Sequence, residues 1–491
     1  MRVAIIGAGP AGMTAALQLC RGGADVTVYE ASQHIGGMSR SLDLWGHRVD
    51  MGPHRFFSTD ARVNGLWLDV VGRDYAMVNR LTRIYYQDKF FHYPLRPFDT
   101  LRNIGLSKAF ACTLSYVKER ILRGQSPHEN ESFESWCVRR FGRKLHETFF
   151  KSYSEKLWGI PCDELSADFA AQRISSFSLP EAILSAISNR RAAQHKTLVD
   201  SFAYPFGGTG AVYDKMADQV RHLGGTIALN TPVRRVVHEG YKVTGLELAG
   251  HENNCTTDES FDHVVSTMPL TSLVRGMQDA PSDVVDAAAQ LRFRNTLLVF
   301  LNIDSSELFD DQWLYIHDPK VQVGRVTNFR NWVPDLYQDQ STSVIACEYW
   351  CDHNDAIWST NDDELIERAT NELRSTRLLN SERVLAGHVE RLPRCYPVYR
   401  RGYRKHVDRI SDHLRQYSGL LPIGRYGSFK YNNQDHSILM GILAAENILN
   451  DARHDLWNVN ADFTQYHERA VIAAEGLISQ PQVSSHAMAI A

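Results

Sequence analysis

Short apolar runs on either side of a glycine turn open the chain. Residues 3–6 (VAII) and 26–29 (VTVY) have the length and continuous apolar character of strands buried in a parallel sheet. Residues 13–20, between them, have the apolar content of a packed helix. The order strand, glycine turn, helix, strand predicts a β–α–β unit at the amino end.

Later regions have other periodicities. Apolar residues recur at helical spacing over 106–122 and 133–158, which predicts helices there. Strand-like runs then follow at 226–229, 232–237, 243–248, 263–269, 297–301 and 343–349. A last strand at 420–425 precedes a helix over 437–449. We therefore expect an α/β protein in which the nucleotide-binding domain is discontinuous.

The expected domain boundaries follow from these changes in pattern. Residues 1–75, 201–275 and 416–455 would form the nucleotide-binding domain. Residues 76–200 would form a mainly helical substrate insertion, and 276–415 a β-rich substrate domain. Residues 456–491 would form a C-terminal helix and tail.

Composition narrows the class of protein. Hydrophobic residues make up 43% and charged residues 22% of the 491 residues, as in ordinary globular enzymes. The formal net charge of -4 gives no reason to expect nucleic acid as a partner, and no apolar run is long enough for a membrane span. Eight cysteines without a CxxC pair indicate reduced thiols in a cytoplasmic protein, with no metal site. The oligomeric state is left open.

The turn GAGPAG at residues 7–12 carries the first chemical signal. Gly7 permits the tight turn, Gly9 lets a pyrophosphate approach the backbone, and Gly12 lets the helix pack on the strand. Glu30 ends the second strand, near the spacing expected of an acid that binds ribose hydroxyls. A glycine turn alone is weak evidence, but in this context it predicts dinucleotide binding.

A second glycine pair favours FAD over NAD. Gly36 and Gly37 follow Glu30 closely, and Met38, Ser39 and Arg40 come next. This order resembles the second fingerprint of FAD proteins in the glutathione-reductase-like superfamily. The resemblance implies an FAD-binding Rossmann domain, with residues 36–40 and Val233 at the cofactor. A plain loop is the alternative.

Residues 50–59, DMGPHRFFST, follow this fingerprint along the chain. The run from Gly52 to His54 is similar to a loop of the UDP-galactopyranose mutases, flavoproteins related to protoporphyrinogen and amine oxidases. In that family the histidine lies against the flavin, so the resemblance implies a catalytic and cofactor-binding role for His54. An imidazole that titrates near neutrality could respond to flavin reduction. A structural histidine capping the loop is the alternative.

The same resemblance implies a substrate site and a second part of the cofactor site. Its substrate-binding residues would be Trp158 at the uridine, Arg173, Arg294 and Tyr396 at the diphosphate, and Tyr431. Arginines suit a diphosphate because each can bind it through two donors. Its further cofactor residues would be Gly424, Arg425, Asn433, Gln434 and Asp435. Taken singly, a tryptophan is usually a core residue and an arginine a solvated one.

The resemblance implies a flavin-dependent mutase acting on a nucleotide-diphosphate sugar. Pyranose and furanose rings would interconvert through an adduct at N5 of reduced FAD, kept reduced by a donor such as NAD(P)H. The run YPFGG at 204–208 resembles the oxidases instead. An FAD-dependent oxidase or desaturase of the protoporphyrinogen oxidase or amine oxidase type is therefore the alternative, and a flavoprotein that binds a partner without turnover is a third.

Overall fold

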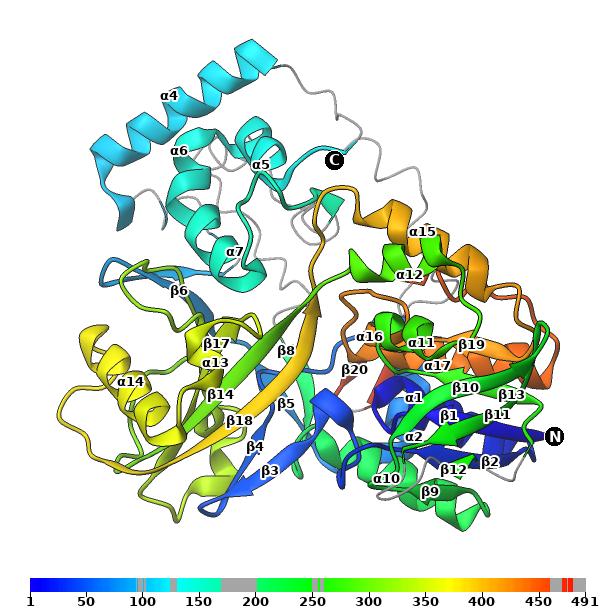
Figure 1. The fold of residues 1–491 in the computed structure, drawn as a ribbon. Helices are drawn as coiled ribbons and strands as arrows, with labels where there is room; N and C mark the ends of the chain where they lie inside the picture. The colour runs from blue at the N-terminus through cyan, green and yellow to red at the C-terminus, as the bar shows by residue number, and fades with distance from the viewer. Residues whose placement is uncertain are drawn as a thin grey trace.

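The computed structural model in Figure 1 describes most of the chain. The described residues are 1–93, 95, 100, 103–123, 130–168, 201–249, 255–256, 260–459, 470–474 and 476–479. Arg173, the first arginine of the expected clamp, lies outside them.

A five-stranded parallel sheet forms the nucleotide-binding domain. Its strands, in spatial order, are β19 (Leu420–Pro422), β13 (His263–Ser266), β1 (Arg2–Ile6), β2 (Asp25–Tyr29) and β9 (Thr226–Ala228). They come from the start, middle and end of the chain. The expected α/β fold with a discontinuous Rossmann domain is therefore confirmed.

Helices and small sheets surround this sheet. The helices are α1 (Pro10–Arg21), α2 (Ala61–Val71), α10 (Gly210–His222), α11 (Leu270–Gly276), α12 (Ser282–Ala289), α15 (Tyr403–Leu414), α16 (Gly424–Gly427) and α17 (Gln434–Leu449). Helix α1 packs on α17 and α10, so the last long helix covers the first. The small sheets are β10 (Val233–Glu239) with β11 (Lys242–Leu248) and β12 (Cys255–Thr256), β3 (Ser41–Leu44) with β4 (His47–Asp50), and β5 (Tyr75–Asn79) with β8 (Ser201–Pro205).

A seven-stranded mixed sheet forms the second body of the molecule (Figure 1). Its order is β18 (Val384–Pro397), β14 (Phe293–Ile303), β17 (Ser343–Cys351), β16 (Arg325–Asn328), β15 (Trp313–Ile316), β6 (Thr82–Tyr86) and β7 (Lys89–His92). Helix α14 (Asp362–Ser375) packs on β18 and β14, after the short α13 (Ala356–Ser359). Short 3-10 turns, Phe329–Asn331 and Pro334–Tyr337, follow β16.

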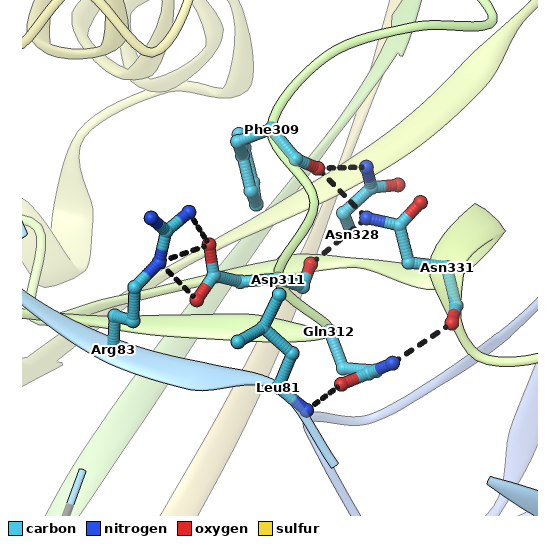
Figure 2. A network of polar contacts seen from close by, with 7 residues as sticks. All are labelled: Leu81, Arg83, Phe309, Asp311, Gln312, Asn328 and Asn331. Atoms are coloured by element: carbon cyan, nitrogen blue, oxygen red, sulfur yellow. Dashed lines mark hydrogen bonds and ion pairs between the residues drawn. The ribbon is translucent and has the colours of Figure 1, made fainter. Parts of the chain in front are cut away.

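Strands β6 and β7 fall in the region expected to be mainly helical. Strand β6 pairs with β15 in parallel, although the two are separated by more than 200 residues. Figure 2 shows why this pairing is specific. Arg83 donates to both oxygens of the fully buried Asp311, at 2.6 to 3.0 Å, and Gln312 accepts from the backbone N–H of Leu81 at 2.6 Å. Local periodicity cannot show such long-range partners.

The helical part consists of α4 (Leu106–Arg123), α5 (Phe133–Phe141), α6 (Arg143–Leu145), a π-helical turn (His146–Phe150) and α7 (Lys151–Trp158). The expected helices over 106–122 and 133–158 are present, but the second is broken at Gly142. Its φ is +84°, and a Cβ there would lie 2.7 Å from the backbone nitrogen of Tyr116. The break therefore lets α4 approach closely.

The described part of the carboxyl end differs from the expected C-terminal helix. Residues Ala470–Ala473 (β20) and Gly476–Ser479 (β21) form a hairpin, and Tyr75 donates to the carbonyl of Ala473 at 2.8 Å. Within the described ranges, no helix is both long and apolar enough to cross a bilayer. Seven cysteines are buried free thiols: Cys20, Cys112, Cys137, Cys162, Cys347, Cys351 and Cys395.

Candidate functional site

The glycine turn between β1 and α1 is built around its own backbone. A Cβ on Gly7, where φ is +99°, would lie 2.2 Å from Oγ1 of Thr267, and one on Gly12 would lie 2.0 Å from the Gly7 carbonyl oxygen. The protein itself therefore requires these two glycines. A Cβ on Gly9 would have its nearest neighbour, Cα of Gly37, at 4.0 Å. The space over Gly9 is thus a cradle that a side chain would fill.

Glu30 is held at the end of β2 by backbone donors. Its carboxylate accepts from Ala8 N–H at 2.8 Å and from Ser32 N–H at 2.9 Å. These bonds bring the acid back over the glycine turn. A carboxylate fixed there suits ribose hydroxyls, as the spacing predicts.

The second glycine pair closes against the first turn. Gly36 donates to the Ala8 carbonyl at 2.9 Å, and the 3-10 turn Gly37–Ser39 follows. Met38 packs on the core of the substrate side, and Ser39 is buried. Arg40 reaches across to β18, where its Nη2 donates to Glu390 at 2.8 Å, while its Nε has no partner among the described residues.

A buried carboxylate anchors the loop that carries His54. Asp50 accepts from Ser41 Oγ at 2.5 Å, Tyr204 OH at 3.0 Å and Thr209 N–H at 3.1 Å. Burial raises the pKa of Asp50 to about 6, although these hydrogen bonds oppose the rise. The run YPFGG thus has a structural role here, because its tyrosine and the turn after it hold the histidine loop.

The backbone of His54 is tied to the nucleotide-binding domain. Its carbonyl accepts from Thr209 Oγ1 at 2.9 Å and from Gln434 Nε2 at 3.0 Å. Gln434 in turn accepts from the Tyr213 hydroxyl at 2.7 Å. These contacts place the histidine beside the start of α17, a predicted part of the cofactor site.

The imidazole of His54 faces two arginines. Burial, then the charges of Arg325 and Arg425, lower the pKa of His54 to about 3. The ring is therefore neutral at physiological pH, and the expectation that it titrates near neutrality is wrong for the protein alone. Its Nδ1 is buried and has no hydrogen-bond partner among the described residues. A neutral ring held this way can donate to, or accept from, a ligand.

Arg325 belongs to a buried ion pair on the central strands. It donates to Glu348 through Nε and Nη2, both at 2.5 Å, and Nη2 lies 3.3 Å from the Tyr396 hydroxyl. The two charged side chains are 14% and 2% exposed. The Glu348 carboxylate holds the Arg325 guanidinium in place. The edge of the guanidinium that lies near Tyr396 is directed toward His54.

Arg425 lies against two tyrosine rings. Its guanidinium carbon is 4.8 Å from the Tyr396 ring centre and 4.4 Å from that of Tyr431. It donates to the carbonyls of Cys395 and Asn432 at 2.8 and 2.9 Å, and its Nη2 is buried without a partner in the described chain. No carboxylate of the described residues pairs with it, so its charge is available to an anion.

Two predicted substrate residues, Arg294 and Trp158, are in contact with other protein groups. Arg294 is buried; it pairs with Asp352 at 2.8 Å and donates to the Trp350 carbonyl at 2.8 Å, so protein acceptors already occupy most of its guanidinium. Trp158 is 1% exposed and stacks on Tyr399 at 6.1 Å, so one face is covered. Trp158 also lies edge-on to Tyr396 and Tyr431, with ring centres 6.4 and 5.9 Å apart. A role for Arg294 and Trp158 at a substrate stays a prediction.

The remaining predicted residues surround the cofactor side. Gly424 begins α16, two residues after β19, with φ +80°, and a Cβ there would lie 3.0 Å from Cβ of Ala11 in α1. Asn433 caps α17 together with His436, and Asp435 lies 3.0 Å from His436 Nδ1. Val233 begins β10, in the small sheet beside the Rossmann domain.

Sequence reasoning missed Arg325, Glu348 and Tyr213. Arg325 begins a short strand, β16, and no local motif marks it. Its importance comes from cross-strand pairing with Glu348 on β17. The strand predicted at 343–349 includes Glu348, but the sequence pattern cannot show that this carboxylate lies opposite an arginine.

The fold and glycine geometry define a dinucleotide-binding enzyme of the Rossmann class. The family model described as flavin containing amine oxidoreductase matches residues 10–449. The chain therefore belongs to this family of FAD-dependent enzymes.

Relatives of two kinds are similar to the chain. A Klebsiella pneumoniae protein named "probable UDP-galactopyranose mutase" is 32% identical over 34% of the chain and only 43% of that protein. Coproporphyrinogen III oxidase of Staphylococcus aureus is 22% identical over 91% of the chain and 98% of that protein. A crystal structure of reduced UDP-galactopyranose mutase superimposes with a TM-score of 0.80, at 20% identity over 94% of the chain and 96% of that structure. These likenesses confirm the fold and superfamily, and they leave isomerase and oxidoreductase open.

The cofactor is FAD, and the site fits it. The open cradle at Gly9 suits a pyrophosphate, and the Glu30 carboxylate suits the ribose. The buried Nδ1 of His54 and Nη2 of Arg425 still lack partners among the described residues. Such atoms are costly unless a ligand satisfies them.

Proposed function

We propose that the chain rearranges the sugar ring of a nucleotide-diphosphate sugar, as a flavin-dependent mutase. The observation that carries the proposal is the convergence of Arg325 and Arg425 on Tyr396 beside His54. Arg425 supplies the positive charge that a diphosphate requires, because Glu348 already pairs with Arg325. The Arg325 guanidinium and the Tyr396 phenol add hydrogen-bond donors beside it. This revised clamp leaves Arg173 and Arg294 as further proposed contacts.

The chain's residues would bind, orient and stabilise charge. FAD, when bound and kept reduced by a donor such as NAD(P)H, supplies the nucleophilic chemistry. Arg425 would attract the departing diphosphate because no described carboxylate neutralises it. His54 would hydrogen-bond to a bound ligand through its buried Nδ1.

An oxidase or desaturase is the second candidate. Its support is the Staphylococcus aureus relative, which aligns with 91% of the chain, whereas the mutase aligns with 34%. A substrate bearing carboxylates would also be attracted to Arg325 and Arg425. The arginines alone therefore do not separate the two reactions.

The test is a panel of nucleotide sugars incubated with the holoprotein, with FAD oxidised or reduced by dithionite. Mass spectrometry of separated products reads the outcome. An isomer of unchanged mass, formed only with reduced FAD, is expected. A product lighter by two hydrogens, or flavin bleaching by substrate without oxygen, would establish the second candidate instead.

Variants then test the assignment of residues. Arg425→Lys keeps a charge but loses the planar stack and the two-donor geometry, so we expect the substrate affinity of the FAD-loaded protein to fall at least tenfold. His54→Ala should retain FAD and lose most turnover. Arg383→Lys is the matched control, because Arg383 is 76% exposed in a surface pair with Asp304. Unchanged affinity in Arg425→Lys would contradict the clamp.

A further inference from the structure

Helix α4 presents four large apolar side chains to solvent along one line. Phe110, Leu114, Val117 and Ile121 are 65%, 54%, 45% and 78% exposed. At 3.6 residues per turn they fall within an arc of about 60° and extend over about 16 Å. We call these four residues the apolar stripe. Figure 1 shows α4 at the edge of the molecule, on the outer side of α5 and α6.

The stripe lies opposite the face that α4 uses for packing. Ala109, Cys112 and Tyr116 are buried, and α4 contacts α5 and α6. A surface helix normally has one apolar face, directed at its core. α4 has two, and the second covers nothing within the described chain. Contiguous exposed apolar surface of this kind marks an interaction site.

Charges beside the stripe indicate what covers it. Lys118 and Arg120 are exposed and flank the stripe on opposite sides of the helix, and Arg120 also donates to the hydroxyl of Tyr116 at 2.7 Å. The one acid of the helix, Glu119, is buried and faces Arg143 at 3.9 Å. The outer face of α4 is therefore apolar in the middle and cationic at both margins.

We propose that α4 is an interfacial helix that docks the protein on an anionic lipid surface. An apolar stripe with basic margins suits a helix lying in the plane of the headgroups, with the apolar side chains below them. A second copy of the chain fits less well, because two such helices would bring Lys118 and Arg120 near the same charges. The proposal is independent of the reaction catalysed.

Co-sedimentation of the FAD-loaded protein with vesicles tests this docking. One set contains phosphatidylcholine and phosphatidylglycerol, and the other phosphatidylcholine alone. We expect binding to the anionic set, weaker binding to the neutral set, and a decrease when the salt rises from 0.1 to 0.5 M. No binding to either set would overturn the proposal.

Matched variants locate the surface. The double variant Phe110→Ser with Ile121→Ser should lower vesicle affinity at least tenfold, because both side chains would lose their burial in the acyl region. Lys118→Glu should lower affinity for the anionic set and leave the neutral set nearly unchanged. Leu336→Ser is the control: Leu336 is 43% exposed on a different segment and should bind as the wild type does.

Sedimentation velocity without lipid completes the test. The wild type and the double variant should sediment alike. Equal vesicle binding by the double variant, or a dimer of the wild type that the double variant abolishes, would overturn the proposal. In the second case the stripe would be assigned to contact between copies. Flavin absorbance and circular dichroism verify that each variant is folded.

Discussion

The glycine turn and the arginine–tyrosine cluster lie on either side of His54, but they are built differently. The turn presents backbone: Gly9 leaves a cradle, and Glu30 is fixed by two N–H donors. The cluster presents charged side chains, Arg325 and Arg425, brought together from distant segments and held by Glu348 and two carbonyls. A backbone site is sensitive to added volume, whereas a side-chain site is sensitive to lost charge. Each kind of change should therefore damage one region and spare the other.

Removal of Arg325 should have the largest effect on stability. Arg325→Ala would leave Glu348 buried without its cation, and we expect a loss of about 3–5 kcal/mol in the free energy of unfolding. Urea denaturation of wild type and variant measures the loss. Arg383→Ala, which breaks an exposed pair, should cost less than about 1 kcal/mol. Similar losses in both variants would mean that burial does not set the strength of these pairs.

Because Asp50 anchors the loop that carries His54, the free energy of unfolding should change with pH in a known direction. Burial raises the pKa of Asp50 to about 6 from the ordinary value of 3.8. Because the pKa of Asp50 is higher in the folded than in the unfolded protein, its protonated carboxyl stabilises the fold below about pH 4. This stabilisation is lost as the pH rises through about 6. Between pH 4 and 7, wild type should lose about 2 kcal/mol of unfolding free energy relative to Asp50→Asn.

Denaturation at several pH values, compared between the two proteins, measures that difference. Asp43→Asn is the control on the same hairpin, since the Asp43 side chain is 75% exposed. The difference in unfolding free energy between Asp43→Asn and wild type should stay nearly constant over this pH range. A constant difference between wild type and Asp50→Asn over the range would show that the buried carboxyl is not a source of pH sensitivity.

The contrast between the two regions also explains how much of the molecule the sequence predicts. The Rossmann strands and the glycine turn were predictable because strand, turn, helix and acid follow one another within 30 residues. Arg325 was not, because its role depends on a strand pairing with Glu348. Arg294 and Trp158 have motif-like neighbours, yet their surroundings in the fold are protein acceptors and aromatic rings. The addition of β6 to the substrate sheet depends on Arg83 and Asp311, 228 residues apart.

Added volume at Gly9 should damage the cofactor site alone. A valine there meets no atom of the described protein close to its Cβ, so Gly9→Val should keep the apoprotein's stability. It would occupy the cradle, and FAD affinity should fall about 10- to 100-fold, or about 1.4–2.7 kcal/mol. Fluorescence titration of apoprotein with FAD measures the affinity. Gly12→Ala is the contrasting variant, because its Cβ would lie 2.0 Å from the Gly7 carbonyl and should destabilise the apoprotein as well. Wild-type FAD affinity in Gly9→Val would remove the cradle from the cofactor site.

The smallest expected effect concerns Arg40, which links the two regions. Nη2 of Arg40 donates to Glu390 on β18, while Nε has no described partner and remains available to the cofactor. A double-mutant cycle with Arg40→Gln and Glu390→Gln should give a coupling of about 0.5–1 kcal/mol, because both side chains are about one-fifth exposed. The coupling should persist when FAD is bound, since the two interactions use different nitrogens. Its disappearance in the holoprotein would mean that the guanidinium leaves Glu390 for the cofactor, and the two regions would then be linked only through His54.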